Sequence, residues 1–230
     1  ISLMGCSSSK DVSTSGGDSS ESDTQAATAS EESSQDTSTE STDTGSSDQT
    51  FKIGISMPTK SLERWNRDGS YLKEQFEKLG YEAELTYSDN DSDQQVNDIQ
   101  NLIADDVNLL VIAAIDGETL STVLADAKEQ NIPVIAYDRL IMNTDAVSYY
   151  VSFDNYTVGK LQGHYIVDAL DLDNAGDKTY NMEITAGDPA DNNATFFYNG
   201  AMDVLKPYID KGTLKVPSGQ NKFEEVATPS

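Results

Sequence analysis

Short apolar runs alternate with amphipathic stretches from residue 51 onward, and this alternation is the main fold signal in the chain. The apolar runs predict strands at residues 51–56, 81–87, 109–114, 132–137, 147–153, 180–186 and 214–216. Apolar side chains three and four positions apart predict helices at residues 62–79, 91–105, 117–130, 158–170 and 194–208. Because strands and helices alternate, we predict an α/β fold of doubly wound parallel sheets.

The same pattern divides the chain into three parts. Residues 51–153 are enough for one α/β lobe, whereas residues 154–230 supply only about two strands and two helices. We therefore expect the second part to be the start of a C-terminal lobe that is incomplete in this sequence. A single compact domain with a ragged end is the alternative.

Residues 1–50 form the third part, and their composition differs from the rest. Residues 7–50 are about half Ser and Thr, with scattered acidic side chains and almost no large apolar ones. Such a segment cannot bury enough surface to offset its ordering entropy, so we predict a disordered linker.

Cys6 is the only cysteine of the chain, which excludes an intrachain disulfide. The residues Leu3-Met4-Gly5-Cys6 resemble a bacterial lipobox, in which a signal peptide is cut before a cysteine that carries lipid. The alternative is a stray thiol in a disordered tail. No run approaches the roughly 20 apolar residues that span a bilayer. We therefore expect a domain outside the cell that is anchored to the membrane only by lipid at Cys6.

The net charge of −25 argues against nucleic acid and against anionic headgroups as partners. His164, the single histidine, has no second His or Cys nearby to share a metal, so we predict neither a metal nor a cofactor. The phosphate-binding glycine motifs and the G-x-S-x-G elbow are also missing, which argues against an α/β enzyme. A transcription regulator would need a basic helix-turn-helix ahead of residue 51, where this chain is acidic.

Polar loops follow four of the predicted strands, at the sheet end where ligands bind in this architecture. They combine carboxylates, Asn, Lys and Arg with one Trp. Sugar hydroxyls both donate and accept hydrogen bonds, so this mixture suits a neutral polyhydroxylated ligand. The ring of Trp65 could lie against the apolar face of a pyranose, whereas the Asp residues would repel an anionic ligand.

Four loop motifs resemble those of the type I periplasmic sugar-binding proteins, and the xylose-binding and multiple-monosaccharide-binding branch is nearest. They are MPTKSLERW (57–65), IAYDRLI (135–141), YVSFDN (150–155) and GDPADNNA (187–194). The resemblance implies two lobes joined by a three-strand hinge, which close around a monosaccharide such as D-xylose. It also implies a monomeric, non-catalytic protein that delivers the sugar to the permease of an ABC importer. A receptor for chemotaxis or two-component sensing with the same fold is the alternative.

The resemblance also implies roles for seven residues of this chain. Lys60 and Arg64 resemble donors to ring hydroxyls, Trp65 a stacking aromatic, Asp138 and Arg139 an acceptor–donor pair, and Asp191 and Asn193 the second lobe's contribution. Further contacts, including a second stacking aromatic, would lie beyond Ser230.

Several of these residues have a purely structural alternative. Arg64 could be a solvated charge, Trp65 could pack a helix on the sheet, Asp138 and Arg139 could form a local ion pair, and Asp191 could cap the next helix. We expect Asn192 to be a cap or turn residue rather than a ligand.

Overall fold

Five short strands pair in parallel in the order β2-β1-β3-β4-β5. The computed structural model describes residues 50–228, so the lipidation site predicted at Cys6 and all but the last residue of the predicted linker lie outside the described residues. The strands are β1 (Lys52–Met57), β2 (Glu82–Tyr87), β3 (Leu109–Ile112), β4 (Val134–Tyr137) and β5 (Val147–Val151). We call them the first sheet.

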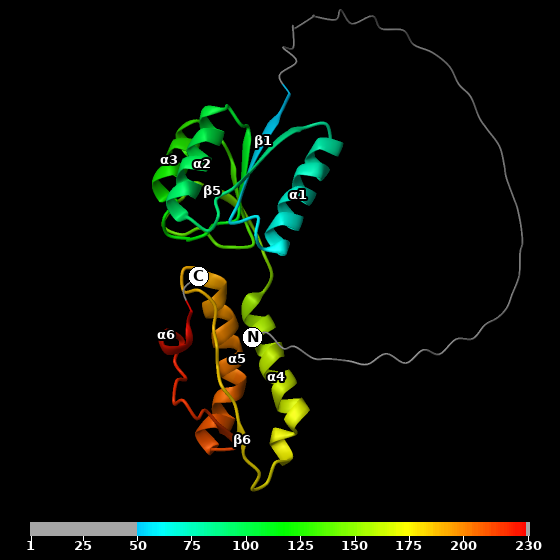
Figure 1. The fold of residues 1–230 in the computed structure, drawn as a ribbon, viewed down its shortest axis with the longest axis vertical. Coiled ribbons are helices and arrows are strands. Elements are labelled where there is room, and N and C mark those ends of the chain that lie inside the picture. Colours follow the sequence, from blue (N-terminus) through cyan, green and yellow to red (C-terminus); the bar gives the residue numbers. More distant parts are fainter. Residues whose placement is uncertain (1–49, 229–230) are drawn as a thin grey trace, which may run out of the picture. The chain divides into compact units, whose positions relative to one another are not determined.

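Helices cover both faces of the first sheet (Figure 1). They are α1 (Glu63–Lys78), α2 (Ser92–Ala104) and α3 (Ser121–Glu129). Successive residues of β3 point to opposite faces, so Leu110 packs with α2 and α3 while Val111 packs with Trp65 of α1. Burial on both faces explains why β3 is continuously apolar in sequence.

A second, smaller set of elements follows the first sheet. It consists of α4 (Asn155–Leu170), a 3-10 turn (Leu172–Asn174), β6 (Tyr180–Asn181), α5 (Asn192–Lys211), β7 (Leu214–Lys215) and α6 (Phe223–Val226). β6 and β7 pair in parallel. Their buried apolar core is small: Val167, Leu172, Leu205 and Leu214.

Glycine determines how α4 and α5 pack. A Cβ at Gly159 would lie 2.3 Å from the carbonyl oxygen of Phe197, and one at Gly200 would lie 2.1 Å from that of Tyr156. Both distances are far below van der Waals contact, so the two backbones approach closely only because these positions carry no side chain.

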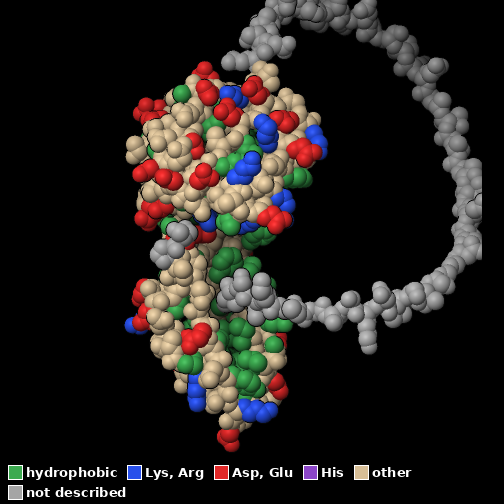
Figure 2. Space-filling model, in the orientation of Figure 1, with side chains coloured by type: hydrophobic (Ala, Val, Ile, Leu, Met, Phe, Trp, Pro, Cys, Tyr) green, Lys and Arg blue, Asp and Glu red, His purple; other side chains and the backbone are tan. Residues whose placement is uncertain are grey.

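Apolar side chains are also exposed on α4, where they gather over one side of the helix (Figure 2). Leu161 and Tyr165 are 63% and 65% exposed. Within residues 50–228, no helix is long and apolar enough to cross a membrane.

The element types agree with the sequence prediction, and the differences lie at the boundaries. The helix predicted from 158 begins at Asn155, because Asp154 caps it by accepting a hydrogen bond from the Thr157 N–H. The helix predicted from 117 begins only at Ser121, after a turn in which Asp116 accepts from the Glu118 N–H.

Two predictions about the later elements were less accurate. The strand predicted at 180–186 contains only Tyr180–Asn181. The short helix Phe223–Val226 was not predicted, because four residues are too few for a periodic signal.

Candidate ligand-binding site

The strand order places a topological switch point between β1 and β3. The chain leaves β1 toward β2 through α1 on one face and leaves β3 toward β4 through α3 on the other, so the two loops diverge. Ligands of open α/β sheets bind at this point, beyond the carboxyl ends of the strands. Four of the predicted site residues lie beyond the carboxyl ends of β1 and β4: Arg64 and Trp65 in the first turn of α1, and Asp138 and Arg139 directly after β4.

Arg64 and Asp138, which are 74 residues apart in sequence, form a bidentate ion pair. Arg64 Nη2 donates to Asp138 Oδ1 at 2.6 Å, and Nη1 donates to Oδ2 at 3.3 Å. Asp138 is buried, at 9% exposure, and has a φ of 65°, in the left-handed region that favours glycine. A paired arginine fork is the geometry in which a buried carboxylate is best satisfied.

Arg139 is held from the opposite side. Its Nη1 donates to the carbonyl oxygens of Ala114 and Ile115, just beyond β3, at 3.1 and 3.2 Å. Its Nε lies 3.1 Å from Asp191 Oδ2 in an ion pair. The local Asp138–Arg139 ion pair considered as an alternative is therefore wrong, because each residue pairs with a distant partner.

One donor of Arg139 is left without an aligned acceptor. The Nε atom is buried and makes no hydrogen bond within residues 50–228, although it forms the ion pair with Asp191. Buried donors nearly always find an acceptor, and a bound water or ligand oxygen is a common one.

Trp65 lies beneath both arginines. The guanidinium carbons of Arg64 and Arg139 are 4.4 and 5.3 Å from its ring centroid, within cation–π range. The ring is only 4% exposed and belongs to the apolar cluster between α1 and the first sheet. Trp65 therefore packs the helix on the sheet, and its stacking on a sugar stays a prediction.

Asp191 and Asn193 bring the start of α5 to the same group. Asp191 caps α5 by accepting from the Asn193 N–H, while its second oxygen contacts Arg139. The Asn193 amide donates to the Asp138 carbonyl oxygen at 3.1 Å and accepts from Asn155 Nδ2 at 2.7 Å. Asp191 thus combines the cap and the predicted site position, and Asn192 is the first residue of the helix rather than its cap.

Lys60 differs from the other predicted residues. It is exposed in the loop between β1 and α1 and has no hydrogen-bonding or ionic partner within residues 50–228. The structure therefore brings six of the seven predicted residues into one connected group and leaves Lys60 outside it.

Sequence reasoning missed three residues that support this group. Asp68 accepts from Arg64 Nε at 3.3 Å, and the Tyr137 hydroxyl donates to the same carboxylate oxygen at 3.3 Å. Asn155 contacts Asn193. The i,i+4 spacing of Arg64 and Asp68 was a usable signal, whereas the Asn155 contact spans 38 residues and had none.

The charges of the group shift several pKa values. Burial opposes the charge on Arg64, but hydrogen bonds and ion pairs with Asp138 and Asp68 outweigh it, so the pKa of Arg64 is raised. Burial raises the pKa of Asp191, and the opposing charge of Arg139 compensates only in part. The pKa of Tyr137 is also raised, by burial and then by the Asp68 charge.

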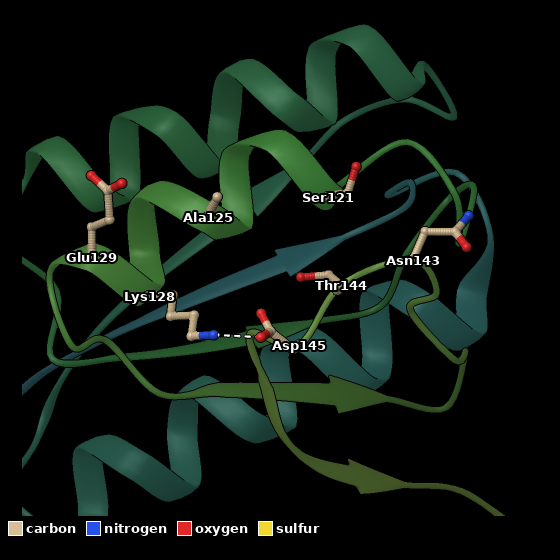
Figure 3. Close-up of a pocket in the computed structure, with 7 residues that line it drawn as sticks. All are labelled: Ser121, Ala125, Lys128, Glu129, Asn143, Thr144 and Asp145. Atoms are coloured by element: carbon tan, nitrogen blue, oxygen red, sulfur yellow. Dashed lines mark hydrogen bonds and ion pairs between the residues drawn. The ribbon is translucent and has the colours of Figure 1, made fainter.

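A separate open hollow of about 560 Å³ lies between α3 and the loop that precedes β5 (Figure 3). The residues that line it are Ser121, Ala125, Lys128, Glu129, Asn143, Thr144 and Asp145. Lys128 Nζ lies 2.6 Å from Asp145 Oδ2 and lowers the pKa of that carboxyl. The hollow shares no residue with the predicted site. In the part of the chain that the structure describes, no group of three or more His, Cys, Asp or Glu could hold a metal ion.

Residues 53–228 match the family model of the periplasmic binding protein domain. The chain belongs to the periplasmic binding protein family. This result and the relatives below confirm the resemblance to type I periplasmic sugar-binding proteins and the predicted α/β fold class. Members of this family are solute-binding proteins rather than enzymes as a class.

The relatives agree with this assignment. The multiple sugar-binding periplasmic protein SbpA of Azospirillum brasilense is 52% identical over 176 residues, which are 76% of this chain and 49% of that protein. The multiple sugar-binding periplasmic receptor ChvE of Rhizobium radiobacter is 50% identical over the same length and shares. The chain therefore spans about half the length of the curated relatives that it matches.

A solved structure is similar as well. The ABC transporter solute-binding protein of Clostridium phytofermentans, with bound β-D-glucose, is 57% identical with a TM-score of 0.76. The match covers 77% of this chain and 55% of the solved one.

Proposed function

We propose that this chain is the sugar-binding part of an extracytoplasmic solute-binding protein that captures a monosaccharide of the xylose or glucose type. The observation that carries the proposal is the connected group of Arg64, Asp138, Arg139 and Asp191 around Trp65, at the switch point of the first sheet. A sugar needs acceptors beside donors, and this group offers both.

Each residue of the group has a role in the proposal. The free N–H groups of Arg64 and the unaligned Nε–H of Arg139 donate to ring hydroxyls, and the carboxylate oxygens of Asp138 and Asp191 accept from others. Asn193 joins the start of α5 to the residue that follows β4, and the exposed Lys60 adds a donor from the loop after β1. Trp65, whose ring is 4% exposed, supports the two guanidinium groups from beneath.

The choice of sugar rests on the relatives. SbpA and ChvE are named multiple sugar-binding proteins, a relative from Escherichia coli at 38% identity is named a D-xylose-binding periplasmic protein, and the Clostridium structure holds β-D-glucose. Aldoses that share the equatorial hydroxyls of glucose and xylose are the substrate class that these names support.

We also propose a membrane-anchored transport role. The names of the relatives support a location outside the cytoplasm and delivery of sugar to an ABC importer. The lipobox-like Leu3-Met4-Gly5-Cys6 supports a lipid anchor at Cys6. Replacing Cys6 by Ser in the bacterium that produces the protein is expected to abolish incorporation of labelled palmitate; unchanged labelling would contradict the anchor.

A signalling role is the second candidate. The relative ChvE is named a receptor, and a fructose-binding periplasmic domain of a hybrid two-component system is 25% identical with a TM-score of 0.61. Loss of sugar uptake on deletion of the gene would support transport, whereas loss of a sugar-induced transcriptional response with normal uptake would support signalling.

Calorimetry on the 230-residue chain tests the binding proposal directly. D-glucose, D-xylose and D-galactose are titrated into the parent and into Arg64→Met, which removes the charge and all five donors. Arg64→Met is expected to weaken binding about 100-fold, the equivalent of about 2.7 kcal/mol. The control Lys78→Met, at the far end of the same helix, is expected to bind within about twofold of the parent. Absence of heat with every sugar, together with a folded circular dichroism spectrum, would overturn the proposal.

A further inference from the structure

The guanidinium of Arg64 is held from two directions. Asp138, directly after β4, accepts hydrogen bonds from both of its terminal nitrogens. Asp68, one turn further along α1, accepts a hydrogen bond from Nε. Three of its five N–H groups are thus used, and two are without a partner within residues 50–228. These two N–H groups are the ones that a sugar could meet.

Asp68 is itself fixed by a residue of the first sheet. The Tyr137 hydroxyl donates to Asp68 Oδ2, the same oxygen that accepts from Arg64 Nε, and both distances are 3.3 Å. The Asp68 side chain is only 17% exposed, whereas that of Arg64 is 46% exposed. A half-exposed arginine has several accessible rotamers, so a shielded carboxylate behind it restricts which way the planar fork faces.

Asp68 is not among the residues that we propose to contact the sugar. Its only other charged neighbour within residues 50–228 is Arg67, whose Nε is 3.8 Å from Oδ1. Tyr137 precedes Asp138, so one strand end provides both the carboxylate that pairs with Arg64 and the hydroxyl that fixes Asp68. Arg64 is therefore held between two carboxylates. The carboxyl end of β4 positions both of them, since Asp138 follows it directly and the Tyr137 hydroxyl binds Asp68.

We propose that Asp68, supported by the Tyr137 hydroxyl, is a positioning residue that fixes the Arg64 guanidinium before sugar arrives. The inference rests on the proposed function for its effect on affinity, but not for its effect on Arg64. Fixing the donors in advance lowers the entropy that binding must otherwise remove, so affinity falls when the clamp is released.

Trp65 provides a readout of this clamp that needs no ligand. It is the only tryptophan of the chain, and the Arg64 guanidinium lies 4.4 Å from its ring centroid. A cation that close to the indole affects its emission, so a displaced guanidinium changes the fluorescence of the 230-residue chain. A change in overall stability alone would leave the emission of the folded state unaltered.

The experiment compares Asp68→Asn and Tyr137→Phe with two matched controls. Glu77→Gln removes one carboxylate charge from the same helix, and Tyr71→Phe removes one exposed hydroxyl from it. Asp68→Asn is expected to weaken sugar binding about tenfold, and Tyr137→Phe about threefold, with the controls within about 1.5-fold of the parent. Both test variants are expected to shift the Trp65 emission in the same direction as Arg64→Met, and neither control is expected to do so.

The outcomes separate this inference from the proposed function. Parent-like affinity and parent-like Trp65 emission in Asp68→Asn would overturn the inference. If the parent binds no sugar, the proposed function fails. The Trp65 emission still decides whether Asp68 positions the arginine, because Asp68→Asn should then shift it in the same direction as Arg64→Met. If Asp68→Asn does not fold, Tyr137→Phe, which loses a single oxygen atom, decides in its place.

Discussion

The first sheet and the α4–α5 pair are both built from parallel elements, but they are packed in different ways. In the first sheet, side chains of β3 and β4 fill the space beneath α2 and α3, with Leu110 and Val134 fully buried. Between α4 and α5 the helix backbones themselves make contact, at Gly159 and Gly200. The first sheet depends on large buried apolar side chains, whereas the α4–α5 pair depends on glycines that leave room for the backbones to approach. Removing side-chain volume should therefore destabilise the first sheet, and adding it should destabilise the helix pair.

The largest expected effect is the loss of volume in the first sheet. Leu110→Ala removes a fully buried side chain from the central strand and is expected to lower the free energy of unfolding by about 4 kcal/mol, measured by urea denaturation. Leu161→Ala, on the exposed side of α4, should change it by less than about 0.5 kcal/mol. Equal losses at both positions would contradict the burial described for β3.

The converse change should damage the helix pair. Gly200→Ala places a methyl group 2.1 Å from a backbone oxygen that cannot move aside, and it is expected to lower the free energy of unfolding by about 3 kcal/mol. The matched glycine of the first sheet is Gly54, whose added Cβ would have side-chain atoms of Leu102 and Leu110 as its nearest neighbours, at 3.1 Å. Gly54→Ala should therefore cost less, and a reversed order would refute the contrast between the two regions.

A smaller effect is expected where the two regions meet. Asn193→Ala leaves the Asp138 carbonyl oxygen with one donor fewer, and it leaves the Asn155 amide with only its 3.4 Å hydrogen bond to Ser152 Oγ, both in buried surroundings. The expected loss of unfolding free energy is about 2 kcal/mol, because two buried polar groups would each lose one hydrogen-bond partner. Asn199→Ala, at an exposed position of the same helix, is the control. A thermal melt of Asn193→Ala that superposes on that of the control would show that this link does not stabilise the fold.

The smallest effect is a pH dependence at Asp191. Since burial raises its pKa above the ordinary value of 3.8, the folded chain binds the Asp191 proton more tightly than the unfolded chain. The contribution of Asp191 to the free energy of unfolding therefore falls as pH rises above about 3.8 and is constant below it.

Asp191→Asn removes this titration. Relative to the parent, the variant should gain stability as the pH is raised from 4 toward neutrality, as followed by thermal melts at each pH. Asp126→Asn, an exposed substitution of the same kind on α3, should not show this trend. A stability difference between Asp191→Asn and the parent that does not vary with pH would contradict the raised pKa.

Apolar periodicity was sufficient for the first sheet. Continuous runs such as residues 109–114 and 132–137 predicted buried parallel strands, because a strand covered on both faces has no polar side to interrupt the run. The strand predicted at 180–186 is too long, because the observed strand contains only Tyr180–Asn181. A sequence pattern indicates which residues could form a strand, but not whether a neighbouring strand is present to pair with them.

The sequence predicted which residues lie together in the candidate site, but not which of them form ion pairs with one another. The loops of Arg64, Asp138 and Asp191 were recognisable because strand ends of parallel sheets gather polar side chains. Which carboxylate pairs with which arginine was not, because Asp138 and Arg139 are adjacent in sequence and yet take partners far along the chain.

The sequence by itself determined the order of strands and helices, the polar character of the loops and the family resemblance, since these depend on local periodicity and on motifs that are contiguous in the chain. Only the tertiary structure decided that Arg64 is clamped between Asp138 and Asp68, that Arg139 pairs with Asp191, and that α4 and α5 meet through glycine. Those contacts join residues that are remote in sequence or depend on how closely two backbones approach. Neither kind of contact produces a periodic pattern in the sequence.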